Sequence, residues 1–190
     1  THGIVGFIQS ADASSPAVMR IANGLGVNEL SISINGVGSF GILSQGSGEA
    51  VEMTVLNSSS IDMTATGGSS TGIFALNQAK QGLLKVDNSG TITGNGDGLR
   101  GISAITGGAP AGGDYVFDIT NSGAITLDAD FATGINLFST RDDDVDATIT
   151  NSGNIDLSAT TDVDSVGILA SFGEADVNAA PMADGDSSVV

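Results

Sequence analysis

The chain has 190 residues, of which 40% are apolar and only 4% aromatic, with 28 glycines and 3 prolines, a composition that favours short strands joined by glycine turns. Its 22 acidic residues against 5 lysines and arginines give a net charge of -17, which excludes binding to the phosphates of nucleic acids and to anionic membrane surfaces. The chain has no cysteine, so it forms neither disulfides nor thiolate metal sites, and it has no apolar run of about 18 residues that would insert into a membrane.

A motif built around asparagine recurs along the chain. VDNSGTI from Val86 recurs in FDITNSGAITL from Phe117 and in ATITNSGNIDL from Ala147, with weaker copies in VLNSSSIDM from Val55 and RIANGLGV from Arg20. The aligned asparagines are 34, 31, 33 and 30 residues apart, and they are Asn23, Asn57, Asn88, Asn121 and Asn151. This period is typical of solenoids, so we interpret the chain first as a repeat protein.

A Gly-Ile pair marks the start of one strand in each repeat. The glycines of these pairs are Gly3, Gly41, Gly72, Gly101, Gly134 and Gly167. The position after the isoleucine points to solvent in such a strand, yet four of the six copies place an apolar residue there. These four are Val5, Leu43, Phe74 and Leu169, and the other two copies have Ser103 and Asn136. An apolar solvent face indicates that a loop or another molecule covers it.

Two stretches near these glycines match the GxGxxG pattern of dinucleotide-binding loops, at Gly36, Gly38 and Gly41 and again at Gly96, Gly98 and Gly101. A dinucleotide site requires a helix to begin at the last glycine. Because a strand is expected there instead, no organic cofactor is predicted.

The stretch between the Gly-Ile strand and the next asparagine varies in length. The extra residues fall in QSADASSP, TGGAPAGGD and STRDDDVD, which we predict to be loops that project from one corner, a common position for binding residues in solenoids. The last of them offers Asp142, Asp144 and Asp146 as candidate calcium ligands, since hard cations favour clustered carboxylates. The alternative is a solvated acidic loop without bound metal.

The second strand of each repeat ends at the asparagine. Apolar residues recur two and four positions before it, at Ile21, Val55, Val86, Ile119 and Ile149, and at Met19, Met53, Leu84, Phe117 and Ala147. The intervening positions are polar, as at Arg20, Lys85 and Asp118. This period of two predicts a strand with one buried face.

The asparagine has the same parity as the buried residues. We therefore predict a ladder in which each buried asparagine amide hydrogen-bonds to the asparagine of the next coil. The Ser-Gly pair that follows is expected to form the corner, with Gly90, Gly123 and Gly153 at positive φ. The alternative is a solvent-exposed Asn-Ser-Gly turn with no ladder.

A third strand surrounds the position four residues after the asparagine. Val27, Ile61, Ile92, Ile125 and Ile155 occupy this position. Three strands in each repeat predict an all-β fold, a parallel β-helix (β-solenoid) with about 30 to 33 residues per coil and five to six coils. Residues 1–190 are expected to form a single solenoid segment within a longer chain or assembly, because the sequence stops inside a coil.

The NSGxI and Gly-Ile repeats, from Gly3 to about Leu169, resemble the passenger regions of bacterial autotransporters and related large secreted adhesins. The resemblance implies a right-handed parallel β-helix located outside the cell or at the bacterial cell surface. It implies no particular ligand.

Two functions are consistent with these observations. The first is a non-catalytic structural or adhesive solenoid, such as an adhesin, stalk or filament subunit, whose partners are other copies of itself or surface carbohydrate or protein. The second is a polysaccharide-active lyase or hydrolase, which requires aspartates beside a base along a strand face. The first reading is preferred, because the chain has only 5 lysines and arginines to provide such a base.

Overall fold

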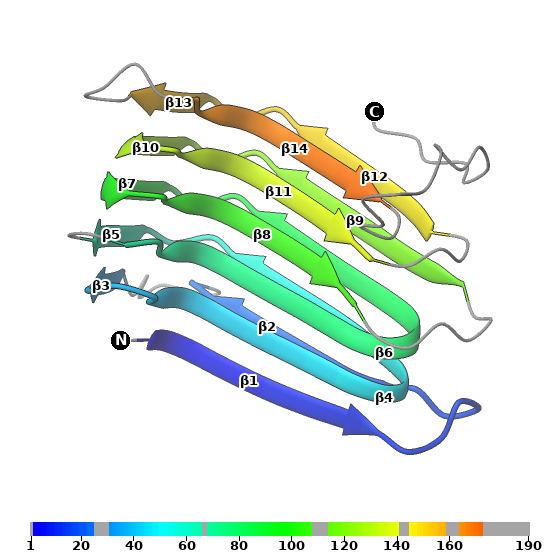
Figure 1. Ribbon diagram of the computed structural model, residues 1–190. Helices are drawn as coiled ribbons and strands as arrows, with labels where there is room; N and C mark the ends of the chain where they lie inside the picture. Colours follow the sequence, from blue (N-terminus) through cyan, green and yellow to red (C-terminus); the bar gives the residue numbers. More distant parts are fainter. Residues whose placement is uncertain are drawn as a thin grey trace.

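The computed structural model describes residues 2–24, 31–65, 68–107, 114–140, 145–158 and 164–172. About 76% of the described residues are in strands, and the strands stack into a β-solenoid (Figure 1). The all-β, parallel β-helix prediction is confirmed. No helix long and apolar enough to cross a membrane occurs in the ranges just given.

Parallel strands form three ladders, one for each strand of the predicted repeat. The first ladder contains β1 (His2–Ser10), the first parts of β4 (Phe40–Asn57) and β6 (Thr71–Asn88), β8 (Arg100–Thr106), β11 (Thr133–Ser139) and β14 (Val166–Phe172). The second contains β2 (Ala17–Asn23), the later parts of β4 and β6, β9 (Tyr115–Asn121) and β12 (Val145–Asn151). The third contains β3 (Ile32–Asn35), β5 (Ile61–Ala65), β7 (Ile92–Asp97), β10 (Ile125–Asp130) and β13 (Ile155–Ser158).

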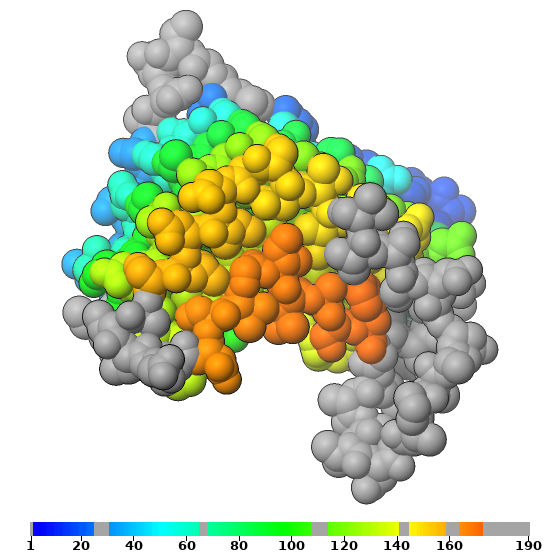
Figure 2. Space-filling model, turned by 90° about the horizontal axis from the view of Figure 1, so that it is seen from above, coloured from blue at the N-terminus to red at the C-terminus, as the bar shows by residue number. Residues whose placement is uncertain are grey.

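The stack makes about four turns. Its first ladder has six strand segments and the other two have five each, which corresponds to the five to six coils predicted. Seen from above, the last strands, β12 to β14, lie over the earlier coils (Figure 2).

Strand register follows the sequence repeats. The asparagines pair from coil to coil in the second ladder, and the isoleucines of the Gly-Ile pairs do so in the first. One predicted position was wrong, because Ile32, and not Val27, pairs with Ile61 in the third ladder. The first coil is longer after its asparagine than the other coils, so a fixed offset selected the wrong residue. Val27 itself lies outside the described residues.

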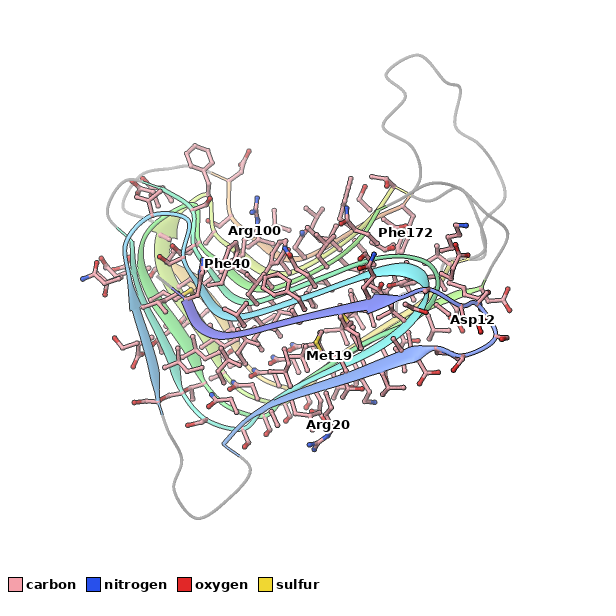
Figure 3. All side chains as sticks on the ribbon, turned by 90° about the horizontal axis from the view of Figure 1, so that it is seen from below. Asp12, Met19, Arg20, Phe40, Arg100 and Phe172 are labelled. Atoms are coloured by element: carbon pink, nitrogen blue, oxygen red, sulfur yellow. The ribbon has the colours of Figure 1, made fainter. Side chains whose placement is uncertain are left out.

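The core lies between the ladders and follows the predicted alternation. Met19 lies between β1 and β2, whereas the adjacent Arg20 points away from the core (Figure 3). Across the core from β2, the first ladder has small residues that point inward. A Cβ atom built on Gly6 would lie only 2.6 Å from Cδ1 of Ile21. Ser44 occupies the same inward position one coil later, is fully buried, and its Oγ has no hydrogen-bond partner.

The asparagine ladder is present. The Nδ2 group of each asparagine donates to Oδ1 of the asparagine in the next coil at 2.7 Å, in the order Asn23, Asn57, Asn88, Asn121 and Asn151. The amides of the last four also donate to a carbonyl oxygen two residues later, at 2.9 to 3.0 Å. Asn23, Asn57, Asn88 and Asn121 are buried as predicted, whereas Asn151, at the end of the ladder, is exposed. Each buried amide is paired with the neighbouring coil, which makes its burial tolerable.

The glycines after the ladder are required for a different reason from the one predicted. Gly90, Gly123 and Gly153 do not have positive φ. Instead, a Cβ atom at Gly123 would lie 1.9 Å from the carbonyl oxygen of Gly90. Gly90, Gly123 and Gly153 are therefore needed because a Cβ atom at each would lie 1.9 to 2.0 Å from a carbonyl oxygen of the preceding coil.

The variable corner lies between the first and second ladders, as predicted. In β4 and β6 the strand runs continuously around this corner through Gly48 and Gly82, whose φ angles are 110° and 143°. In the other coils the chain leaves the ladders after β1, β8 and β11 and returns at β2, β9 and β12 (Figure 1).

Candidate functional site

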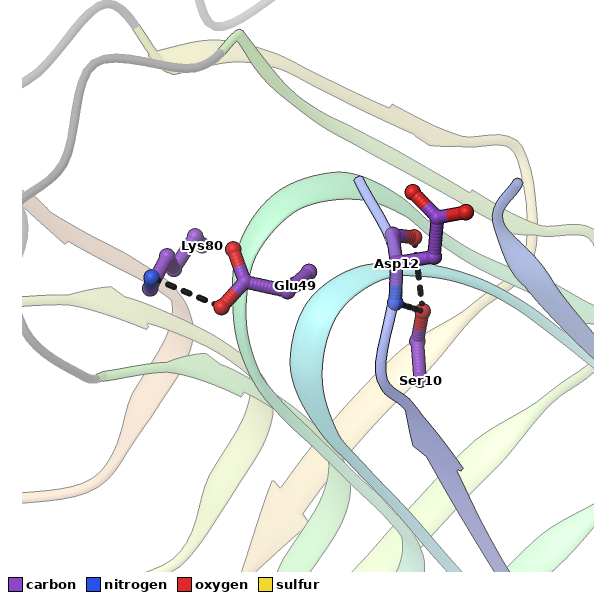
Figure 4. A network of polar contacts seen from close by, with 4 residues as sticks. All are labelled: Ser10, Asp12, Glu49 and Lys80. Atoms are coloured by element: carbon purple, nitrogen blue, oxygen red, sulfur yellow. Dashed lines mark hydrogen bonds and ion pairs between the residues drawn. The ribbon is translucent and has the colours of Figure 1, made fainter. Parts of the chain in front are cut away.

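The variable corner carries polar groups that satisfy one another. The Ser10 hydroxyl donates to the carbonyl oxygen of Asp12 at 3.0 Å, and Lys80 pairs with Glu49 of the neighbouring coil at 2.7 Å (Figure 4). The Asp12 carboxylate accepts hydrogen bonds from the backbone N–H and the hydroxyl of Ser14, which hold the pKa of Asp12 below its usual value. These polar groups bind one another, so their contacts stabilise the corner itself.

The predicted calcium ligands are only partly described. Asp146 lies at the start of β12 with its side chain exposed. Asp142 and Asp144 lie outside the described residues. Within the part of the chain that the structure describes, no group of three acidic or histidine side chains is placed to hold a metal ion. The calcium site therefore stays a prediction from the sequence.

A different surface stands out by its composition. The six strand segments of the first ladder, residues 2–9, 40–47, 71–78, 100–106, 133–139 and 166–171, contain none of the chain's 22 acidic residues. Their charged or titratable side chains are His2 and Arg100, and Arg100 points away from the core (Figure 3). We call the outer surface of these segments the acid-free face.

Inward glycines establish which side chains belong to this face. Cβ atoms built on Gly6 and Gly46 would contact core side chains of the second ladder, so the residues beside these glycines point outward. One outward column runs across the coils through Phe7, Gln45, Leu76, Ile105, Phe138 and Ser171. The neighbouring column contains Val5, Leu43, Phe74, Ser103, Asn136 and Leu169. The predicted apolar solvent face is therefore wider than the single column recognised in the sequence.

The side chains on the acid-free face pack against one another. The ring of Phe40 stacks on His2 at 5.3 Å between centroids and lies 5.0 Å from the ring of Phe74. Leu43 is only 6% exposed although it points outward and is not part of the main core cluster. Asn136 donates to the Ser103 hydroxyl at 3.2 Å, so the polar pair within the face is satisfied internally.

The other two outer surfaces are acidic. Glu52, Asp87, Asp118 and Asp146 lie on the strands of the second ladder, and Asp62, Asp128 and Asp156 lie on those of the third. Several of these carboxylates bind neighbours on adjacent coils. Thr93 donates to Asp62, and Asn95 donates to Asp128 at 3.1 Å. Charge therefore divides the solenoid into two acidic faces and one face free of acid.

One exposed aromatic residue has a strained backbone. Phe131 has φ 57° and is 63% exposed, whereas Gly38 and Gly98, with φ 63° and 62°, occupy the same corner in earlier coils. The left-handed conformation costs a non-glycine residue about 1 to 2 kcal/mol. Phe131 lies two residues before β11, at the rim of the acid-free face.

On the outer face of the second ladder, Lys85 lies beside Asp118. Nζ of Lys85 is 2.5 Å from Oδ2 of Asp118 in the next coil, and both side chains are about one-third exposed, at 37% and 36%. The hydrogen bond from Lys85 to Asp118 raises the pKa of Lys85 above its usual value. A general base must lose its proton near neutral pH, so this shift opposes such a role.

Comparison with known proteins gives no relative: no family model, curated protein or solved structure matches this chain.

Sequence reasoning missed the acid-free face as a whole. It identified one outward column from the residue after Gly-Ile, but the column that contains Leu76, Ile105 and Phe138 was not recognised. A tally of acidic residues by predicted ladder would have revealed it. The left-handed backbone of Phe131 could not be predicted from its own sequence. It is recognised only because Phe131 occupies the same corner as Gly38 and Gly98 of earlier coils.

Proposed function

We propose that the chain is a non-catalytic structural or adhesive β-solenoid, of the adhesin, stalk or filament-subunit kind, located outside the cell or at a bacterial cell surface. The observation that carries this proposal is the combination of a stiff repetitive body with one acid-free apolar face. The body provides length and rigidity, and the face provides the contact surface.

Stiffness is supported by bonding that runs along the solenoid. The coils from β1 to β13 are joined to one another by backbone ladders on three sides and by the asparagine amides inside, and β14 pairs with β11. These bonds lie parallel to the long direction of the stack, so bending or stretching the rod would strain many of them together. Such continuity suits a protein that bears mechanical load.

A contact role is supported by the contrast between faces. Exposed apolar surface bounded by charged surface is typical of interaction sites on soluble proteins. Here the outward apolar residues include Phe7, which is 68% exposed, and they are flanked by two acidic faces.

A polysaccharide-active enzyme is the alternative, and the Lys85–Asp118 pair is the observation in its favour. Lyases and hydrolases of this kind need a base and an acid on one strand face. The raised pKa of Lys85 and its engagement by Asp118 weigh against that role.

The two functions are separated by one pair of measurements on the native protein. We expect the purified chain to leave acidic polysaccharides intact and to form elongated particles or assemblies in electron micrographs. Depolymerisation that is lost in both Lys85→Met and Asp118→Asn would overturn the structural proposal. Intact polysaccharide together with elongated assemblies would eliminate the enzymatic one.

A further inference from the structure

We propose that the acid-free face is the surface through which two copies of this chain pair side by side. This inference rests on the proposed function and deepens it by naming the partner of the contact surface.

Charge determines which surfaces of two identical copies are able to meet. Each copy has a net charge of -17, and the outer sides of the second and third ladders carry carboxylates on successive coils. Bringing such faces together places like charges opposite each other, which costs several kcal/mol. The acid-free face is the described surface of the three ladders on which two copies approach without facing carboxylates.

The chemistry of the face suits an identical partner. Leu76, Ile105 and Phe138 form a half-buried apolar column across successive coils. A two-fold axis would place this column against its own copy, so that the same patch serves both subunits. The polar pair near the middle, Ser103 and Asn136, is already hydrogen-bonded, which lowers the cost of removing it from water.

The size of the face predicts a modest affinity. Six strands about 4.8 Å apart, each presenting about seven residues with a rise of about 3.3 Å, span roughly 650 Å². A standard protein interface buries about 800 Å² on each partner. We therefore expect a reversible dimer with a Kd on the order of 1 to 100 µM.

Two other occupants fit the face less well. A sugar-binding site requires several polar groups placed to bind hydroxyls, whereas the outward columns of this face are mostly apolar and Ser103 and Asn136 are bonded to each other. The chain's own segment 173–190 contains Glu174, Asp176, Asp184 and Asp186, so laying it across the apolar column would bury charge.

Sedimentation velocity of the full chain, from about 1 to about 300 µM, tests the pairing. The wild-type protein is expected to shift from monomer to dimer. Leu76→Asp places a charge in the middle of the column and is expected to weaken dimerisation at least tenfold. The matched control is Val116→Asp, at an outward position on the second ladder that is 38% exposed, and it is expected to change the Kd by less than twofold.

Gln45→Glu provides a second variant that adds charge with almost no change in shape. Gln45 is half-buried and lies next to Leu76 in the same outward column. We expect it to weaken pairing by three- to tenfold at low salt and less at high salt, because added salt screens the new repulsion. Circular dichroism of each variant at low concentration distinguishes lost pairing from lost folding, and Gln45→Glu alone decides the question if Leu76→Asp does not fold.

Three results would overturn the pairing. They are a wild-type chain that stays monomeric at the highest concentration, equal weakening by Leu76→Asp and Val116→Asp, and no effect of Gln45→Glu. A monomer that binds polysaccharide or cell surfaces, and loses this binding on Leu76→Asp, would overturn the pairing and leave the adhesive function standing. A monomer that depolymerises polysaccharide would overturn both.

Discussion

Asn121 illustrates how a single side chain joins coils. It is fully buried, accepts a hydrogen bond from Asn88 and donates to Asn151 and to the Gly123 carbonyl. Its replacement would remove one hydrogen-bond partner from the buried Asn88 amide and one from the side-chain oxygen of Asn151. Each asparagine of the ladder therefore also supplies hydrogen-bond partners to the asparagines of the adjacent coils.

We expect Asn121→Ala to lower the free energy of unfolding by about 3 kcal/mol, because the Asn88 amide and the Asn151 carbonyl oxygen lose a buried partner. Urea denaturation measures this change. Thr150→Ala, at an exposed position on β12, is the control and is expected to have little effect. Equal stability of Asn121→Ala and wild type would mean that the ladder contributes nothing.

Phe131 has the opposite character, since its backbone conformation is unfavourable. Phe131→Gly is expected to raise the free energy of unfolding by about 1 kcal/mol through release of the left-handed strain. Phe131→Ala keeps a Cβ atom in that conformation and is expected to give no such gain. Thermal melts of both variants check the prediction, and a gain in Phe131→Ala equal to that in Phe131→Gly would refute the strain argument.

At the scale of one strand, the Gly-Ile pair is a packing device. A Cβ atom on Gly101 would lie 2.5 Å from the carbonyl oxygen of Gly134 and 2.8 Å from Cγ2 of Ile125. The glycine lets the strand turn tightly against the next coil while the following isoleucine enters the core. The pair recurs in each repeat because successive coils approach this closely at the same position.

Gly101→Ala is accordingly expected to destabilise the protein by about 3 kcal/mol, because the nearest atom is backbone and does not yield. Gly167→Ala is a matched control at the same repeat position, where a Cβ atom would meet nothing within 4 Å. Denaturation curves of the two variants should therefore differ. Similar curves would show that the close approach is not limiting.

Between strands β6 and β9, the Lys85–Asp118 pair makes a pH-dependent contribution. Lys85→Met is expected to cost about 0.5 kcal/mol at most near neutral pH, because exposed ion pairs contribute little. The folded pKa of Lys85 is raised above 10.5, so the contribution is complete below the unfolded pKa and is lost as the pH rises through the folded one. Unfolding measurements at about pH 8 and about pH 12 should show this difference shrinking, and a constant difference would contradict it.

At the scale of the whole molecule, the net charge of -17 works against the compact state. Raising sodium chloride from about 0.05 to about 0.5 M is expected to increase the melting temperature by screening this repulsion. Comparing calcium with magnesium at equal concentration tests the predicted ligands Asp142, Asp144 and Asp146. A calcium site would raise the melting temperature further in calcium than in magnesium, and Asp144→Asn would remove this difference. Equal melting temperatures in the two cations would mean that they act only by screening charge.

The sequence by itself determined the repeat, the three strands of each coil and the inward position of the asparagines. These properties follow from local periodicity, because alternation and repeat spacing specify which side chains share a face. Val27 was assigned to the position that Ile32 occupies, because an insertion in one coil changes the offset without changing the pattern.

Only the tertiary structure decided how the coils approach and which faces result. The distance between Gly123 and the Gly90 carbonyl, the left-handed backbone of Phe131 and the joining of six separate segments into one acid-free face all depend on contacts between residues about 30 positions apart. Local periodicity specifies the direction of a side chain, whereas the stacking of coils determines its neighbours.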